Sequence, residues 1–240
     1  MIPFRCMNRR MPLTVSSRDG SSNALSWLLY LLSSRPDCVN RIRQEFDSVL
    51  GERPLSYTDV PKFEFTTQVM LEALRLYPPF WMVDRMALAD DRAGDLAIPR
   101  GSTVVVFIYG VHHSPQYWEN PESFDDERFS KVKEKLHTPF THLPFGAGPR
   151  GCIGGNYAML QILMIPSVLL RKYDFRLVPG QTIEARPMVI LRPGARNPHD
   201  LHRGNPTRRR QTVRLFTLIK PCELTPYSRG APTSILFGEN

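Results

Sequence analysis

The sequence predicts a mainly α-helical protein with a small mixed β-sheet, and three observations support this fold class. Apolar residues recur at helical spacing in the stretches 24–32, 42–49, 69–77 and 156–170. Short runs rich in β-branched residues, separated by Pro and Gly turns, lie within 86–110 and 176–194. A hydrophobic content of 42% in 240 residues is enough to form a sizeable core.

The first two predicted helices are separated near Pro36. The apolar stripe before it consists of Leu25, Leu28, Leu29 and Leu32. The stripe after it consists of Ile42, Phe46 and Val49. Because proline cannot continue a helix but fits the first turn of a new one, we expect a break at Arg35–Pro36. Gly51 suits the end of the second helix.

The remaining elements follow from the same kind of pattern. A third helix is predicted over 67–77 and ends at Pro78–Pro79. Strand-rich sequence follows up to residue 110, and residues 114–143 are mostly irregular. A long apolar helix begins near residue 156, and its interior Pro166 should cost about 3 kcal/mol or kink the helix. Two short strands complete the series before residue 195.

Charge and cysteine content exclude several functional classes. The net charge is +8, but it is concentrated at the ends, with +3 over residues 1–20 and +6 over 192–240. The near-neutral body does not fit a nucleic-acid-binding protein. Four scattered cysteines without a CxxC pair argue against zinc and for a reducing, cytoplasmic location. We find no apolar run long enough for a membrane span.

The stretch PFGAGPRGCIGG, residues 144–155, contains five glycines and precedes the long apolar helix. A cysteine at a helix N-terminus is favoured as thiolate, and here Arg150 adds a nearby cation. The glycines allow backbone N–H groups to approach the sulfur of Cys152, and Phe145 is placed to shield it. An exposed thiolate at this position suits a nucleophile, a redox sensor or a metal ligand.

Glu72 and Arg75 lie three residues apart on the third helix and therefore share a face. An exposed pair of this kind contributes about 0.5 kcal/mol, whereas a buried pair needs further partners for the guanidinium. Arg128, within DDERF at 125–129, is a candidate for the same carboxylate. The adjacent His112 and His113 follow a strand at a turn, and we interpret them as a surface feature.

These motifs together resemble those of one family. The pattern F-x-x-G-x-R-x-C-x-G at 145–154 resembles the heme-binding loop of the cytochromes P-450, the heme-thiolate monooxygenases. The pattern E-x-x-R at 72–75 resembles the ExxR helix of that family. The DERF segment at 126–129 resembles the part that supplies the third member of its Glu-Arg-Arg cluster.

The resemblance covers residues 16–195 and corresponds to the C-terminal half of the cytochrome P-450 fold, closest to soluble, bacterial-style members. Residues 1–15 form an unassigned basic start that does not look like the first turns of a helix. Residues 196–240 form a basic, linker-like tail. Its last residues, TSILFGEN, faintly resemble the beginning of a fused reductase.

The resemblance implies roles around a heme b (iron protoporphyrin) cofactor. Cys152 is then the axial ligand of the heme iron, and Gly146 lies close to the flat cofactor. Arg150 meets a heme propionate, and Phe145 shields the sulfur. Arg85 falls at a second propionate-binding position, although a surface arginine at a strand edge is an equal alternative.

Further roles concern the core and the substrate. Glu72, Arg75 and Arg128 are implied to lock the core behind the heme. The turn after the ExxR helix is implied to line the substrate pocket with Phe80, Trp81, Met82 and Val83, although a core-packing role is an equal alternative for Trp81. The implied reaction inserts one atom of O2 into a small apolar organic substrate, with electrons from a reductase or ferredoxin.

The sequence also departs from the family. Asp19 matches the acidic position that helps to deliver protons to bound oxygen, but Gly20 stands where the family has a threonine. The part of the family's domain that precedes this helix is not represented. An alternative is therefore a non-catalytic, truncated remnant that binds heme weakly or not at all, and another is a thiol-redox protein that uses Cys152.

Overall fold

The computed structural model describes residues 4–177, 183–194, 200–202 and 213–214, with side chains from residue 18 to residue 194 of these ranges. The α-helices are α1 (Phe4–Ser33), α2 (Pro36–Leu50), α3 (Glu64–Leu76), α4 (Ile108–His112), α5 (Lys131–Glu134) and α6 (Gly155–Lys172). The strands are β1 (Val83–Met86), β2 (Asp91–Ala93), β3 (Leu96–Ile98), β4 (Thr103–Val106), β5 (Asp174–Arg176), β6 (Glu184–Pro187), β7 (Leu191–Gly194), β8 (Asp200–His202) and β9 (Val213–Arg214). The fold is therefore mainly helical, as predicted.

The β-structure differs from the mixed sheet that we expected. The described strands form four small sheets, β1–β4, β2–β3, β6–β7 and β5–β8–β9, and every pair is antiparallel. Three of the pairs are hairpins or nested hairpins, and short reversals of the chain join antiparallel neighbours. A parallel pair needs a long crossover connection, which these segments do not provide.

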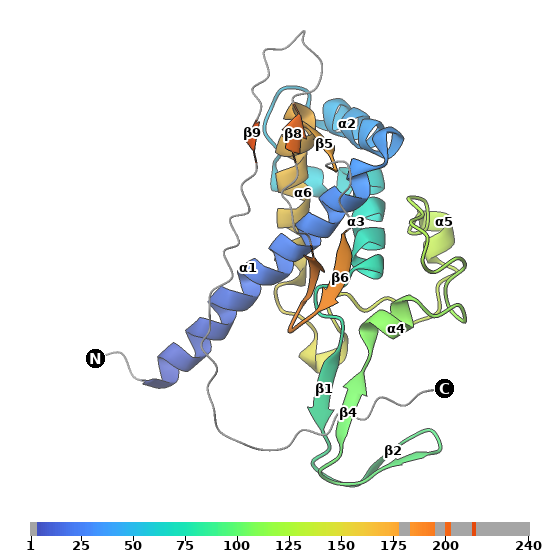
Figure 1. Cartoon of the computed structure of the whole chain (residues 1–240). Helices are drawn as coiled ribbons and strands as arrows, with labels where there is room; N and C mark the ends of the chain where they lie inside the picture. The colour runs from blue at the N-terminus through green and yellow to red at the C-terminus, as the bar shows by residue number, and fades with distance from the viewer. Residues whose placement is uncertain (1–3, 178–182, 195–199, 203–212, 215–240) are drawn as a thin grey trace.

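Four helices form the hydrophobic core. Helix α1 packs against α2, α3 and α6, and α2 and α3 also contact each other and α6 (Figure 1). Their buried apolar faces include Leu28, Leu32, Ile42, Phe46, Val69, Met70, Leu74, Leu163 and Leu170. The predicted stripes therefore face one common interior, as amphipathic helices require.

The break between α1 and α2 lies at the predicted position. Helix α2 starts with Pro36, and Gly51 follows its last residue with a φ of +56°. A side chain of α2 also caps the next helix, α3. Glu45 accepts hydrogen bonds from the N–H groups of Phe65 and Thr66 at 2.8 and 2.9 Å, which caps the first turn of α3.

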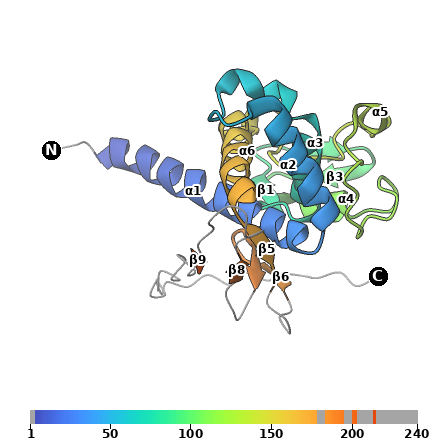
Figure 2. The same ribbon diagram turned by 90° about the horizontal axis from the view of Figure 1, so that it is seen from above.

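The expectation of a non-helical start over residues 1–15 is wrong, because α1 begins at Phe4 and includes Pro12. Once a helix is nucleated, each further residue adds one hydrogen bond at little extra cost. The later part of α1 packs on the other helices, and its first turns project away from them in two perpendicular views (Figures 1 and 2).

Two further details differ from the sequence prediction. Residues 86–91 lie mostly between β1 and β2, and residues 108–112 form helix α4 rather than the end of a strand. Helix α6 continues through Pro166, which is buried in its interior. The tail contributes β8, which pairs with β5, and β9, which pairs with β8, whereas TSILFGEN lies outside the described residues.

Candidate functional site

The glycine-rich loop folds back on itself and presents Cys152 just before α6. The N–H of Cys152 donates to the carbonyl oxygen of Phe145 at 2.8 Å, and the N–H of Gly151 donates to that of Gly148 at 3.0 Å. Gly146 and Gly148 have φ values of +68° and +67°, a region that other residues rarely adopt. Glycine at these two positions therefore permits the turns that close the loop around the cysteine.

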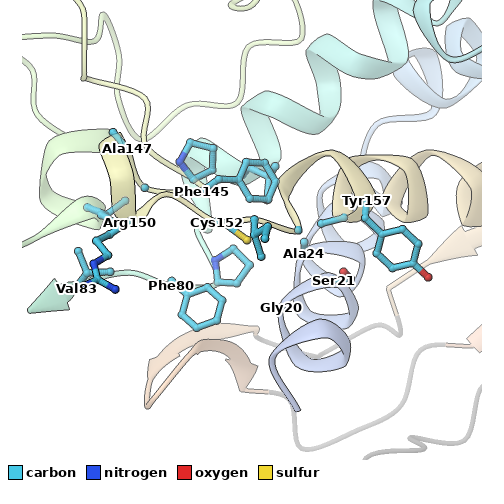
Figure 3. A pocket seen from close by; sticks show the side chains of 18 of the residues that line it. Gly20, Ser21, Ala24, Phe80, Val83, Phe145, Ala147, Arg150, Cys152 and Tyr157 are labelled. Carbon is cyan, nitrogen blue, oxygen red and sulfur yellow. The ribbon is translucent and has the colours of Figure 1, made fainter. Parts of the chain in front are cut away.

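Cys152 lines an apolar cavity of about 360 Å³, a size typical of small-molecule and cofactor sites. The walls come from α1, from the segment after α3, from the loop and from the first turns of α6. Figure 3 shows the sulfur between Phe145 and Phe80, with Gly20 and Ser21 of α1 on another side. The structure thus brings together segments that are about 130 residues apart in the sequence.

The two described cysteines have opposite environments. Cys38 is buried in α2, and burial raises the pKa of its thiol to about 12. A thiol in this environment is unreactive at neutral pH. Cys152 is exposed to the cavity. Of the cysteines with described side chains, Cys152 is therefore the one that is accessible to a ligand.

Two guanidinium groups line the same cavity. Arg85 comes from β1 and Arg150 from the short turn Gly148–Arg150 within the loop. Arg85 donates one hydrogen bond to the carbonyl oxygen of Asp84 at 2.6 Å. Among the described side chains, neither guanidinium forms an ion pair with a carboxylate of this chain. Their positive charges are therefore available to an anionic group in the cavity.

The donor set of the cavity fits a heme. It contains one thiol that can bind iron, two guanidiniums that suit carboxylates, and apolar walls that suit a porphyrin ring. Within the described residues there is no cluster of three or more His, Cys, Asp or Glu side chains that would suggest a different metal site. The residues able to hold the cofactor are Cys152, Arg85, Arg150, Phe145 and Gly146.

Glu72, Arg75 and Arg128 meet in the interior next to the cavity-forming segments. Arg75 donates to both carboxylate oxygens of Glu72, through Nε to Oε2 at 2.7 Å and through Nη2 to Oε1 at 2.9 Å. Arg128 Nε donates to the same Oε1 at 3.1 Å. Glu72 and Arg75 are both 0% exposed, so one carboxylate faces two guanidiniums without direct access to water.

Backbone oxygens complete the coordination of this cluster. Arg75 donates three more hydrogen bonds, to the carbonyls of His112, Pro121 and Ser123. All five guanidinium donors of Arg75 are therefore occupied, as a buried arginine requires. Arg128 likewise donates to the carbonyls of Glu119, Asn120 and Ser123. The cluster thus fastens α3 to the irregular segment 119–125.

The interpretation of His112 and His113 as a surface feature is wrong. His112 is 0% exposed, and its ring bridges the carbonyl of Arg75 and the N–H of Leu143 at 3.0 and 2.8 Å. His113 is partly buried and stacks on Tyr109. Burial lowers the pKa of His112 to about 3, so its ring is neutral at physiological pH. The expectation failed because the two residues follow a strand in sequence, but His112 is the last residue of helix α4, which contacts α3, and His113 is the residue that caps this helix.

The four substrate-pocket candidates separate into two pairs. Phe80 and Val83 line the cavity, whereas Trp81 and Met82 do not. Trp81 donates its indole N–H to the carbonyl of Met188 at 2.7 Å and lies edge-on to Phe107. The indole thus ties the segment after α3 to the tip of the β6–β7 hairpin.

Asp19 lies on α1 but is not among the cavity-lining residues. Its Oδ2 is 3.4 Å from a guanidinium nitrogen of Arg192 on β7. The expected role in proton delivery therefore has no geometric support here. The neighbouring residues Gly20 and Ser21 do line the cavity, and Ser21 Oγ donates to Gln161 of α6 at 2.8 Å. Successive side chains of a helix point about 100° apart, so the sequence match at position 19 could not fix the direction of the Asp19 side chain.

Over the described part of the chain, no helix has the length and apolar composition needed to cross a bilayer.

Comparisons with known proteins agree with this geometry. The profile of the family described as "Cytochrome P450" matches residues 10–197. The chain is 34% identical over 173 residues to Protein LUTEIN DEFICIENT 5, chloroplastic, of Arabidopsis thaliana, covering 71% of this chain and 29% of that protein. It is 37% identical over 157 residues to Cytochrome P450 3A2 of Rattus norvegicus, covering 65% of this chain and 31% of that protein.

A bacterial relative shows a similar degree of identity. Cyclooctatin synthase of Streptomyces melanosporofaciens is 33% identical over 184 residues, covering 77% of this chain and 40% of that protein. The similarity thus extends to plant, rodent and bacterial members alike, and the chain spans 29–40% of the length of these three relatives. The profile match, together with the loop that carries Cys152 and the buried Glu72 cluster, places the chain in the cytochrome P450 family.

Proposed function

We propose that this chain carries the thiolate-ligand side of a heme-dependent monooxygenase. The observation that carries the proposal is the cavity in which the exposed Cys152 thiol and the guanidiniums of Arg85 and Arg150 face the same apolar space. Membership of the cytochrome P450 family supports heme-dependent monooxygenation in general. The chain spans 29–40% of the length of the three relatives above, and its own activity is part of what we propose.

The residues of the loop act by binding and orientation. Cys152 would provide the thiolate ligand of heme b, and Arg150 and Arg85 would pair with its propionates. A Cβ on Gly155 would lie 3.4 Å from the ring of Phe145, so this ring rests on the first turn of α6 and covers the loop. When bound, a thiolate-ligated heme iron supplies the cleavage of the O–O bond of O2, because the thiolate pushes electron density toward the iron.

The apolar wall selects the substrate in this proposal. Phe80, Val83 and Ala24 present hydrocarbon to the cavity, and apolar surface of this kind favours a small apolar organic substrate. O2 is the second substrate, and a reductase or ferredoxin supplies the electrons. A cytoplasmic location completes the proposal.

A second candidate is a chain that binds heme weakly and does not turn over. Large apolar side chains next to the cavity are open to solvent, with Ile153 96% and Tyr157 60% exposed. Exposed apolar surface of this extent needs a cover, and a cover excludes water from a reacting center. The chain as described does not provide that cover for these two side chains.

The test is a spectrum of the purified full chain after addition of heme, reduction and exposure to CO. We expect the red-shifted band of a thiolate-ligated complex, lost in Cys152→Ser and retained in the matched control Cys38→Ser. Absence of heme uptake would refute the proposal that this chain acts as an enzyme. Heme uptake without the red-shifted band would favour the second candidate, and fast alkylation of Cys152 without heme uptake would favour a thiol-redox protein.

A further inference from the structure

His112 joins the helix of the Glu72 cluster to the loop that carries Cys152. Its Nδ1 lies 3.0 Å from the carbonyl oxygen of Arg75, and its Nε2 lies 2.8 Å from the N–H of Leu143. The backbone carbonyl of His112 also accepts a hydrogen bond from Arg75 Nη1 at 2.7 Å. Residue 112 therefore contacts the last turn of α3 in two ways and the start of the loop in a third.

The two ring contacts fix one neutral tautomer. A carbonyl oxygen can only accept, so Nδ1 carries the proton and donates it to the carbonyl of Arg75. A backbone N–H can only donate, so Nε2 is unprotonated and accepts from Leu143. A doubly protonated ring would lose the second contact. The complete burial of the ring disfavours that charged form.

Leu143 is the residue at which the loop is attached. Its N–H is held by His112, and its carbonyl oxygen accepts from the N–H of Gly146 at 3.0 Å. The next bond in the series runs from the N–H of Cys152 to the carbonyl of Phe145 at 2.8 Å. A shift of Leu143 would therefore be transmitted, through adjacent residues, to the turn that sets the position of the cysteine.

We propose that His112 is a positioning residue, which sets the location of the Cys152 loop relative to α3 through the Nε2 contact with Leu143. Its effect on heme ligation rests on the proposed function, whereas its effect on the loop rests on the geometry alone. The chain uses the ring to span two backbone groups that no shorter side chain can join.

Two variants separate the two ring contacts. His112→Gln keeps an acceptor at the end of the side chain, near the position of Nε2, but lacks the donor at Nδ1. His112→Asn keeps a donor near the position of Nδ1, but does not reach Leu143. The matched control is His113→Asn, because His113 is in the same turn and its Nδ1 contacts only the carbonyl of Tyr109 within α4.

The first readout is the hydrogen-exchange rate of the Leu143 amide in the full chain without heme, normalised to amides in the middle of α6. We expect about tenfold faster exchange in His112→Asn, because the amide loses its acceptor, and a change within about twofold in His112→Gln and His113→Asn. Equal exchange in His112→Asn and the unchanged chain would overturn the proposal. Equal acceleration in the Gln and Asn variants would also overturn it, because the Nε2 contact would not be the one that matters.

The second readout is the fraction of thiolate-ligated CO complex after heme is added. We expect His112→Asn to reduce this fraction about tenfold relative to His112→Gln, in proportion to the fraction of chains with the loop in place. If the unchanged chain takes up no heme, the proposed function fails while the amide exchange still decides the role of His112. If the exchange rates differ as expected but the CO spectra do not, the link from the loop to the heme is refuted.

Discussion

Replacement of Arg75 by methionine should remove a large part of the stability of this chain. The change deletes five buried hydrogen bonds, two to the carboxylate of Glu72 and three to backbone carbonyls. Arg128 still donates to Glu72 and to the carbonyl of Ser123, and the N–H of Asp125 still donates to Glu72, so these two acceptors are not left without a partner. The carbonyls of His112 and Pro121 lose the guanidinium donor that holds them.

The expected magnitude follows from these losses. Removal of one partner of a buried ion pair costs about 3–5 kcal/mol, and each backbone acceptor left without its donor adds about 1 kcal/mol or more. Even when part of the carboxylate's loss is offset by Arg128, the sum is about 5 kcal/mol. A domain of ordinary stability has about 5–15 kcal/mol in total, so Arg75→Met should lose between about a third and all of it.

The assay is urea unfolding of the full chain, followed by far-UV circular dichroism. The matched control is Arg41→Met, because Arg41 makes two ion pairs that are half exposed, and the loss of such pairs costs less than about 1 kcal/mol. Arg75→Lys should also be strongly destabilised, since an ammonium has three donors for five acceptors. A free energy of unfolding for Arg75→Met within about 1 kcal/mol of the control would refute this account of the cluster.

Two other predictions concern the histidines and α1. Burial lowers the pKa of both His112 and His142 to about 3, so these groups take up protons on unfolding as the pH falls below about 6.5. The contribution of these histidines to the free energy of unfolding should therefore be full above that pH and fall by about 2 kcal/mol for each histidine between pH 7 and pH 5. His142→Phe should remove the part of this pH dependence that belongs to His142. An unchanged dependence of the free energy of unfolding on pH, measured by urea unfolding, would contradict this. Gly20→Ala should raise the free energy of unfolding by up to about 1 kcal/mol because alanine favours the helix, and a Cβ would meet the Phe80 ring at an ordinary 3.4 Å. A decrease in that free energy would show that the ring cannot accommodate the methyl group.

The loop and the Glu72 cluster could be predicted from the sequence because their chemistry depends on residues at short, fixed spacings. Glycines around a cysteine and a Glu-x-x-Arg pair on an apolar helix each constrain local geometry. The meeting of Arg128 with Glu72 spans 56 residues, so local spacing could name Arg128 only as a candidate, and the family resemblance supported that pairing. Short spacings in the sequence predicted the local geometry of each segment, whereas the family resemblance predicted which distant segments are in contact.

Side-chain direction and burial could not be predicted in the same way. His112 and His113 are identical neighbours, yet His112 is fully buried and bridges two segments, while His113 follows the end of α4 and stacks on Tyr109 of that helix. Asp19 precedes two cavity-lining residues but is 3.4 Å from Arg192 of β7. In both cases a rotation of about 100° per residue along a helix decides the environment, and only tertiary packing fixes its phase.

The backbone acceptors of the Glu72 cluster have a consequence for how this protein tolerates mutation. Six of the hydrogen bonds donated by the side chains of Arg75 and Arg128 end on backbone carbonyl oxygens of segment 112–123. A carbonyl is present whatever the side chain is, so substitutions at positions 119–123 leave these acceptors in place. The segment can therefore vary in sequence while its path stays fixed, provided that the two arginines and the carboxylate are retained.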